Sequence, residues 1–459
     1  MANLLFTSYA YPATGGTTSL TTPSRFGNML TLKDFGAVGD GAADDSIPWM
    51  NAVASGKNLF VSPGTYRIPT GIAQPITGQK IFGIPGASVL TKTSTGTNYI
   101  QPTLLIKDVF DVIVDGLTFT VPLGVLRQYA FIMRATTQGS CGRIRISNCE
   151  FNNSPAFIER FVNVAWINSN QFLGGGANGA LNGISTGGQI NATSGGTDNT
   201  AGLVQNLFFT NNYFESVRSE GIDINWDTWN ACIDNNVMFD CGLAGTNEDI
   251  DIGGGEGALF CKRISVTNNK IWMTSAATNA NNGITVKLTS DNVLIANNSI
   301  ISDQVATETG FGISVGSGAT NTIVRGNYIA GFSRGMHVSS GPTIITDNIV
   351  TANGTFGIDC QATHMTVTGN QCYNNSITTA GNYGFRFQTG SDYSLVQNNK
   401  SYDTQGTPTQ NGFLFQAQTI GRFIVNGNIA VPVLATPMNG LTAGNLPNSL
   451  LGAAGNITV

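Results

Sequence analysis

Two short acidic segments of this sequence have the residue types and spacing that acid–base chemistry needs. They read EGIDIN at 220–225 and EDIDIG at 248–253, and they share the pattern I-D-I. Their acids are Glu220, Asp223, Glu248, Asp249 and Asp251. The whole chain contains only 27 acidic residues among 459, so this clustering needs an explanation. Like charges about 5 Å apart do not all ionise, and we expect at least one of these carboxyls to keep its proton near neutral pH.

A protonated carboxyl beside an ionised one is the arrangement that glycoside hydrolysis uses. One group protonates the leaving oxygen, and the other acts as base or nucleophile. Neighbouring pairs would suit the retaining separation of roughly 5–5.5 Å, whereas a diagonal pair such as Glu220 with Asp251 would reach the inverting separation of roughly 6.5–9.5 Å. The sequence leaves this choice open. The alternative for the whole cluster is a set of exposed acids that only keep the surface hydrated.

Side chains near the acids are candidates for holding a sugar. They are Tyr213, Arg218, Trp226, Asp227, Trp229, Lys287 and, farther along the chain, His337. Aromatic rings offer flat apolar faces to sugars while their polar edges stay wet, although core packing is the alternative for each ring. Arg218 and Lys287 would hold an acidic sugar. For His337, an incidental place on the surface is the alternative.

The elements that must position these residues are short, repeated strands. From about residue 140, the pattern IxxNxF or VxxNxI recurs at intervals of 21 to 42 residues. Its shared asparagines are Asn170, Asn212, Asn236, Asn269, Asn298, Asn327, Asn348, Asn370, Asn399 and Asn428. A second pattern, GIxV, recurs between them. Short strands with period-two alternation and bends rich in Asn and Gly indicate a chain that coils around one axis.

We therefore predict an all-β fold, a right-handed single-stranded parallel β-helix of about 11–13 coils. Coils would stack about 4.8 Å apart, so asparagines in register would form a hydrogen-bonded ladder. The outward x positions of GIxV would form a column of Ser185, Asp223, Asp251, Thr285, Ser314, His337, Asp359, Arg386 and Leu414. The longest interval, between Asn170 and Asn212, indicates a protruding loop or an extra coil that forms one wall of a binding groove.

The open end of such a stack needs a cover, because an exposed strand edge pairs with other chains. Asp44-Asp45-Ser46 offers capping oxygens, and Ile47, Met50 and Val53 follow at helical spacing. These residues predict a short amphipathic capping helix at about 44–55.

The chain divides into three parts on this interpretation. An uncharged N-terminal arm covers 1–30, the β-helix covers 31–430, and an uncharged C-terminal tail covers 431–459. No charged side chain precedes Arg25 or follows Arg422. Because disordered tails are usually charged and poor in aliphatic residues, we expect both ends to cap the stack or to pack against neighbouring subunits.

The segment around the capping helix resembles a known superfamily. DFGAVGDG at 34–41, DDS at 44–46 and VSPGTYRI at 61–68 resemble the opening of the pectate-lyase-like β-helix superfamily. The preceding stretch, 24–30, leads into this motif much as in bacteriophage tailspikes. The resemblance implies a homotrimeric tailspike in the virion tail that degrades a capsule, an exopolysaccharide or an O-antigen at the bacterial surface. Other phage tail proteins would be further partners, and the start of the chain lacks the pattern of a signal peptide.

The acidic segments also resemble a loosened polygalacturonase pattern. In this resemblance Asp223 is the acid of the first catalytic strand, and Glu248 and Asp249 are the paired acids one coil later. Lys287 corresponds to the lysine of that family's RIK strand. Thr285 stands where the arginine would be, and the family's Gly-His-Gly motif is missing. Pectin is therefore not the expected substrate.

Three functions follow from these observations. The first is hydrolysis of a bacterial polysaccharide by an endoglycosidase, which needs no metal or other cofactor. The second is a polysaccharide lyase for a uronate-containing polymer, in which calcium or an arginine would neutralise the uronate carboxylate. The third is a receptor-binding spike without catalysis. The net charge of −5 argues against a nucleic-acid partner, and no apolar run approaches the roughly 18 residues that membrane insertion requires.

Overall fold

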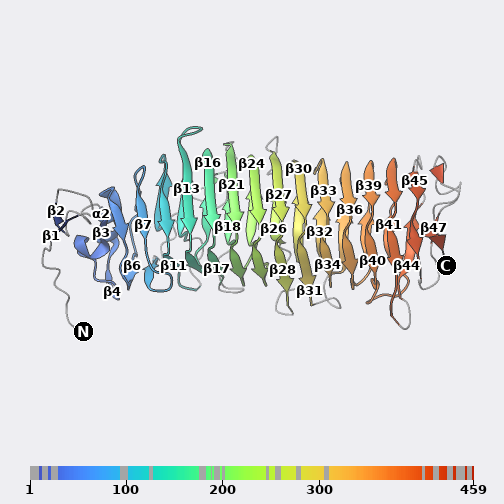
Figure 1. The fold of residues 1–459 in the computed structure, drawn as a ribbon, viewed down its shortest axis with the longest axis horizontal. Coiled ribbons are helices and arrows are strands. Elements are labelled where there is room, and N and C mark those ends of the chain that lie inside the picture. The colour runs from blue at the N-terminus through green and yellow to red at the C-terminus, as the bar shows by residue number, and fades with distance from the viewer. Residues whose placement is uncertain are drawn as a thin grey trace.

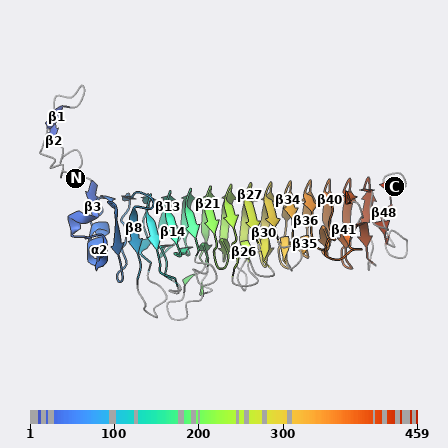
Figure 2. The same ribbon diagram turned by 90° about the horizontal axis from the view of Figure 1, so that it is seen from below.

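The computed structural model is an elongated stack of short parallel strands, drawn along its long axis in Figure 1. It describes residues 10–12, 19–21, 29–93, 102–123, 128–174, 182–187, 189–190, 197–198, 202–243, 248–253, 260–274, 281–303, 310–405, 409–416, 423–431, 438–440, 450–451 and 457–458. The capping helix α2 (Ser46–Ala54) lies at one end and strand β48 (Leu450–Leu451) at the other (Figures 1 and 2).

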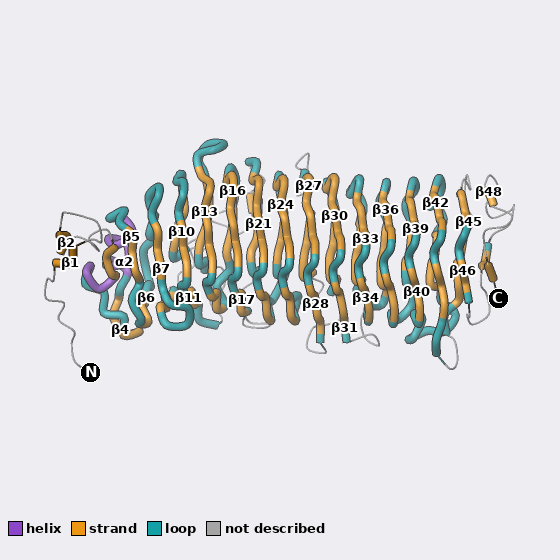
Figure 3. The backbone as a smooth tube through the Cα atoms, viewed as in Figure 1, coloured by secondary structure: helices purple, strands orange, loops and turns teal. Residues whose placement is uncertain are grey.

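Three parallel sheets run the length of the stack. The first sheet has 16 strands, from β3 (Met29–Thr31) to β48, and the second has 16, from β4 (Asp40–Asp44) to β49 (Ile457–Thr458). The third sheet has 13 strands. Each coil passes from the first sheet through the second to the third, and short loops turn the corners (Figure 3). The predicted parallel β-helix is confirmed.

The third sheet carries both acidic segments and the GIxV positions. Its strands are β9 (Leu104–Lys107), β12 (Phe131–Arg134), β15 (Ala156–Ile158), β18 (Ile184–Thr186), β23 (Ile222–Asn225), β26 (Glu248–Gly253), β29 (Asn282–Lys287), β32 (Phe311–Val315), β35 (Arg334–Val338), β38 (Ile358–Cys360), β41 (Tyr383–Phe387), β44 (Asn411–Phe415) and β47 (Met438–Asn439). Thirteen of the described coils thus contribute to all three sheets and three more contribute only to the first two, so the stack is longer than the predicted 11–13 coils. The other two sheets are longer because coils at both ends contribute no strand to the third.

The predicted asparagine ladder is present at the corner between the first and second sheets. The Nδ2 group of each ladder residue donates to Oδ1 of the next, for example from Asn236 to Asn269 at 2.9 Å and from Asn269 to Asn298 at 3.0 Å. The residue before each ladder position adopts a left-handed conformation, as Asn235 does with φ 54°. Asparagine and glycine tolerate this conformation better than other residues, which explains their abundance.

The capping helix is shorter than predicted and buries a different face. It covers 46–54 instead of 44–55, and it buries Ser46, Trp49, Ala52 and Val53. The sequence prediction was wrong for Ile47, which is 65% exposed. The indole Nε1 of Trp49 donates to the Thr103 carbonyl at 3.0 Å, just before the first strand of the third sheet. The helix therefore covers the end of that sheet.

The long interval between Asn170 and Asn212 contains an insertion and no extra coil. Asn170 donates directly to Oδ1 of Asn212 at 3.0 Å, so their coils are neighbours. Within the insertion, β19 (Gln189–Ile190) and β20 (Thr197–Asp198) form an antiparallel pair.

The two ends of the chain lie partly outside the described residues. In the predicted arm, β1 (Ala10–Pro12) pairs with β2 (Ser19–Thr21). In the predicted tail, β47, β48 and β49 extend the third, first and second sheets. The coiling therefore continues beyond residue 430. Contacts of either end with neighbouring subunits stay a prediction.

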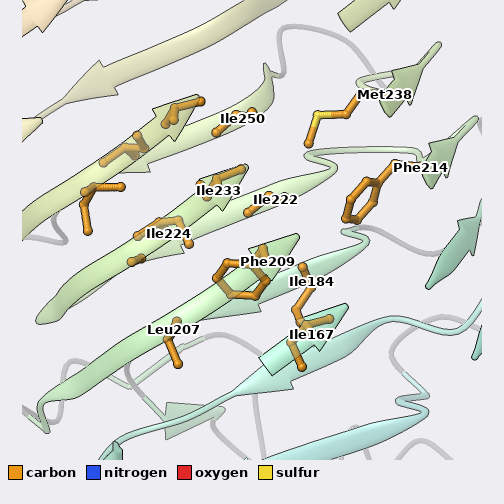
Figure 4. Packing of buried hydrophobic residues seen from close by; sticks show 14 of the residues in the cluster. Ile167, Ile184, Leu207, Phe209, Phe214, Ile222, Ile224, Ile233, Met238 and Ile250 are labelled. Carbon is orange, nitrogen blue, oxygen red and sulfur yellow. The ribbon is translucent and has the colours of Figure 1, made fainter. Parts of the chain in front are cut away.

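The core is a continuous column of apolar side chains enclosed by the three sheets. Figure 4 shows Ile184, Ile222 and Ile250 of the third sheet facing Phe209 and Ile233 of the first. These side chains are fully buried. Identical positions of successive coils stack on one another, so the core holds each coil in register and determines which side chains face outward.

Candidate active site on the third sheet

The outward column predicted from GIxV is present in the predicted order. The strand register pairs Ser185 with Asp223, Asp223 with Asp251, and Asp251 with Thr285. It continues through Ser314, His337, Asp359, Arg386 and Leu414. Neighbouring members lie one strand spacing apart, about 4.8 Å. Asp223 and Asp251 are therefore directly adjacent.

A second column runs beside the first, at the residue before the glycine of each GIxV. Glu248 pairs with Asn282, and Phe311 pairs with Arg334. The glycine itself is required where coils approach closely, because a Cβ on Gly283 would lie 2.7 Å from the Gly312 carbonyl oxygen. The site therefore consists of two parallel rows of side chains on a rigid surface.

A lysine of β29 pairs with two acids of the adjacent rung, β26. The ammonium nitrogen of Lys287 lies 2.8 Å from Oδ2 of Asp251 and 3.8 Å from Oε1 of Glu248. The acids are buried, since Asp223, Glu248 and Asp251 are 8%, 9% and 5% exposed. Asp223, Glu248 and Asp251 lie together as the sequence predicted, with Lys287 among them, and the charge of Glu220 acts on both Asp223 and Glu248.

Amide groups fix the orientation of the Asp223 carboxyl. Nδ2 of Asn182 donates to its Oδ2 at 3.0 Å and to the Ser185 hydroxyl at 2.7 Å. The side-chain amide of Asn225 donates to its Oδ1. Sequence reasoning missed Asn182 and Asn225 as site residues, although both lie within three residues of a column position.

Burial and mutual repulsion raise the pKa values of Asp223, Glu248 and Asp251. Burial, followed by the charges of Glu220 and Asp251, raises the pKa of Asp223 well above its ordinary value. Burial raises the pKa of Asp251 to about 7, and Lys287 limits that increase. The pKa of Glu248 is also raised by burial. Burial alone would lower the pKa of Lys287, but Asp251 and Glu248 raise it. Burial and repulsion thus favour the acid form of Asp223, whereas the adjacent Asp251, with a pKa of about 7, is paired with a charged lysine.

The prediction that Asp249 joins the outward patch is wrong. Asp249 occupies the glycine position of its repeat, and its side chain is fully buried beside Cys241 and Asp240. Neither of its carboxylate oxygens has a hydrogen-bond partner of normal geometry among the described residues. Burial raises its pKa well above the ordinary value. Asp249 cannot reach a substrate on the outer face of the third sheet.

The predicted aromatic residues lie outside the two columns. Tyr213 is on the second sheet, where its hydroxyl donates to Glu215 at 3.0 Å. Trp229 is on the first sheet, where its indole donates to the Phe260 carbonyl at 3.1 Å. Trp226 occupies the bend between the third and first sheets, with φ 43°. Proximity along the chain therefore does not place Tyr213 and Trp229 on the sheet of the acids, because a corner of the coil intervenes.

The remaining predicted binding residues are at the margins of the site. Asp227 is in the same bend as Trp226. Arg218 is in the corner that leads into β23, and its buried Nε has no hydrogen-bond partner among the described residues. His337 is in the outward column, three rungs beyond Asp251.

Metal binding was not expected for a hydrolase. The described part of the chain contains no group of three or more His, Cys, Asp or Glu side chains arranged to hold a metal ion. The calcium that a lyase would require stays a prediction.

Comparisons with known proteins agree with this fold. A family model described as rhamnogalacturonase A/epimerase, pectate lyase-like, matches residues 29–247. A model of a right-handed β-helix region matches residues 201–344. Over these ranges the chain is similar to pectate-lyase-like and right-handed β-helix proteins, which confirms the resemblance found in the sequence.

Solved structures place bacteriophage tailspikes among the similar folds. Tailspike protein 3 of bacteriophage CBA120 superposes with a TM-score of 0.64 at 14% identity, over 89% of this chain and 63% of that one. This chain thus spans less than two thirds of that tailspike. The A-module of mannuronan C-5 epimerase AlgE6 from Azotobacter vinelandii superposes with a TM-score of 0.51 at 14% identity, over 94% of this chain and 99% of that one. No curated protein sequence matches the chain. No helix among the described residues is both long and apolar enough to cross a membrane.

Proposed function

We propose that this chain is a tailspike-type depolymerase that hydrolyses glycosidic bonds of a bacterial surface polysaccharide on the outer face of its third sheet. The observation that supports this most strongly is the adjacent pair Asp223 and Asp251. Both are buried, both have raised pKa values, and only Asp251 is paired with a lysine at 2.8 Å. In this proposal Asp223 keeps its proton, and Asp251 ionises near neutral pH beside Lys287.

The two acids take different roles in this proposal. Asp223 donates its proton to the glycosidic oxygen as the bond from that oxygen to the anomeric carbon breaks. The Asp251 carboxylate either forms a bond to the anomeric carbon or removes a proton from the attacking water. Their spacing of one rung, about 4.8 Å, suits the first route with retention. If Glu220 or Glu248 supplies the base instead, the longer separation gives inversion.

The relatives support a polysaccharide substrate and a phage setting. One relative is named a tailspike protein and another a mannuronan epimerase. We place the protein in the virion tail, with action outside the host cell at the bacterial surface, where it would adjoin other tail proteins.

We further propose that the chain forms a homotrimer through the outer face of the first sheet. A mostly apolar column occupies that face in register, interrupted by Ser265 and Thr366. Its apolar members are Trp166, Phe208, Cys232, Leu294, Ile323, Ile344, Leu395 and Ile424. Ile344 and Ile424 are 41% and 43% exposed. Long apolar strips on a protein surface mark association sites, and this one lies on a different sheet from the carboxylates.

The test of the proposed hydrolysis is a product analysis with three single variants. A panel of capsules, exopolysaccharides and O-antigens is incubated with the full chain, and products are examined by mass spectrometry and reducing-end assay. Asp223→Asn and Asp251→Asn should each slow chain shortening by about 10²–10⁴-fold. Glu150→Gln, on the second-sheet strand β14 (Glu150–Asn152), is the control and should change nothing. Unchanged cleavage in both aspartate variants would reject the proposal.

The same experiment separates the alternative functions. Products with an ultraviolet-absorbing unsaturated end would identify the lyase, and in that case activity should also be tested with and without calcium. The raised pKa of Lys287 argues against that residue as the lyase base, because it stays charged near neutral pH. Binding without any shortening would identify a receptor-binding spike.

A further inference from the structure

A second polar cluster lies on the outer face of the third sheet and is built around Asp359. The carboxylate of Asp359 is fully buried. Arg386 binds it with two hydrogen bonds, from Nε to Oδ1 at 2.7 Å and from Nη2 to Oδ2 at 2.6 Å. Gln388 donates to Oδ1 at 2.8 Å. This paired geometry already satisfies the buried carboxylate.

A second arginine and a histidine converge on the same oxygen. Nη1 of Arg334 donates to Oδ2 of Asp359 at 3.0 Å, and Nδ1 of His337 lies 3.3 Å from it. The guanidinium of Arg386 lies over the Phe356 ring at 3.7 Å from its centroid, and that of Arg334 lies over Phe311 at 5.5 Å. Both guanidinium groups are thus held in place by aromatic faces as well as by hydrogen bonds.

The charges of this cluster do not balance. Two guanidinium groups share one carboxylate, which leaves one positive charge in excess even with a neutral histidine. Burial and the charge of Arg386 lower the pKa of Arg334, although Asp359 opposes them. The side chain of Arg334 is also the most accessible of the group, at 31% exposed against 16% for Arg386. Desolvating a second cation beside a satisfied carboxylate brings little stability to the fold, so Arg334 is available to an external anion.

The cluster lies in line with the carboxylates. His337 is in the same outward column as Asp223 and Asp251, and Arg334 is in the same second column as Glu248. Three rungs separate His337 from Asp251, which corresponds to about 14 Å at the strand spacing. A polysaccharide extended along this face would therefore place a sugar a few residues from the cleaved bond over Arg334.

We propose that Arg334, supported by Arg386 and His337, is a subsite that binds an anionic substituent of the polysaccharide, a carboxylate or a phosphodiester. Guanidinium groups match the planar oxygens of both. The inference rests on the proposed function for the identity of the ligand as a polysaccharide, and it adds that the substrate is acidic.

Binding measurements test this subsite without requiring cleavage. Acidic capsular polysaccharides are immobilised, each beside its carboxyl-reduced form, together with phosphodiester-bearing polymers and neutral O-antigens. Binding of the full chain is measured by biolayer interferometry at several salt concentrations. We expect acidic polymers to bind, and Arg334→Gln to weaken that binding by about tenfold or more. Arg325→Gln is the matched control, because Arg325 is an exposed arginine on the first-sheet strand β33 (Thr322–Arg325).

Each outcome has a defined meaning. Loss of binding on carboxyl reduction identifies a carboxylate as the recognised group, and retained binding to phosphodiester polymers that depends on Arg334 identifies a phosphate. Arg334→Lys should restore part of the affinity, and circular dichroism checks that each variant is folded. Binding only to neutral polymers, or equal affinity of Arg334→Gln and the unaltered chain, would overturn the inference. Arg334-dependent binding without any chain shortening would uphold this subsite and reject the proposed hydrolysis.

Discussion

Lys287 of β29 pairs diagonally with Asp251 of the adjacent strand β26, and its side chain passes over a residue of β26 that has no side chain. The direct strand partner of Lys287 is Gly253. A Cβ at Gly253 would lie 3.1 Å from Cγ and 3.2 Å from Cε of the lysine. The glycine thus leaves room for the lysine side chain to lie flat, and its ammonium group ends 2.8 Å from the Asp251 carboxylate.

Removing the lysine should shift the pH dependence of cleavage. The Lys287 charge limits the burial-induced rise of the Asp251 pKa, which is about 7 with the lysine present. In Lys287→Met that pKa should rise further, so Asp251 ionises only at higher pH. The acidic limb of the pH–rate profile should move upward by about one unit or more. Reducing-end assays across a range of pH values measure this shift, and Lys270→Met on the second-sheet strand β28 (Lys270–Met273) is the control. An unmoved limb would show that Asp251 is not the base.

Filling the space at Gly253 should have a similar but weaker effect. Gly253→Val places a branched side chain where the lysine stem lies, and the ion pair with Asp251 should lengthen. We expect about a tenfold loss of activity near neutral pH and partial recovery at higher pH, where Asp251 ionises without help. Gly316→Val is the milder comparison, because a Cβ at Gly316 would lie 3.5 Å from Cβ of Lys287, an ordinary contact distance. Full activity of Gly253→Val at every pH would contradict the proposal that Lys287 helps Asp251 to ionise.

Asp249 should make the protein less stable as the pH rises. Its folded-state pKa is raised by burial, so the folded chain keeps a proton that the unfolded chain loses above its ordinary pKa of about 3.9. Stability therefore falls with increasing pH between these two values, by up to about 1.4 kcal/mol per pH unit. Below about pH 4 this penalty is absent.

The Asp249→Asn variant isolates that contribution. Its free energy of unfolding should differ from that of the unaltered chain by a constant amount below about pH 4, and it should gain relative stability as the pH approaches neutrality. Denaturant titrations at several pH values measure the difference. A difference that does not change with pH would mean that Asp249 ionises normally in the folded chain.

The interior of the asparagine ladder should be sensitive to substitution. Asn269 donates to Asn298 and to the Ile233 carbonyl, and it accepts from the backbone and side chain of Asn236. Asn269→Ala leaves several buried groups unpaired and should cost about 3–5 kcal/mol of stability. Asn168→Ala, at a partly exposed asparagine that ends β16 (Val162–Asn168) beside the ladder, should cost about 1 kcal/mol. Equal losses of stability at both positions would show that ladder hydrogen bonds contribute no more than those outside the ladder.

Charges on the apolar face of the first sheet should separate the proposed subunits. Phe208 stacks on Trp166 at a centroid distance of 6.0 Å, and neither ring is part of the core. Phe208→Glu should convert a trimer into monomers in sedimentation experiments while far-ultraviolet circular dichroism stays unchanged. Val237→Glu, at an exposed residue of the second sheet, should leave assembly intact. A monomeric unaltered chain would refute the proposed assembly directly.

Much of this protein follows from its sequence because the repeats are local and periodic. Strand alternation and the recurring asparagines predicted the parallel coils and the ladder from Asn170 to Asn428. The GIxV pattern predicted that Asp223, Asp251 and His337 share one outward column. Each prediction needs only the knowledge that equivalent residues of successive coils stack at one spacing.

The corners of the coil were decided by the tertiary structure alone. The packing of neighbouring coils decides which side chains at the ends of the third-sheet strands are buried, so Asp249 is buried although its neighbour Glu248 faces Lys287. A corner also separates Tyr213 and Trp229 from the acids that they adjoin in the chain. The second column, with Arg334 beside Asp359, follows from the same corners. Bends depend on the packing of neighbouring coils against one another, whereas straight strands depend on the alternation of a single segment, and only the latter can be read from a sequence by itself.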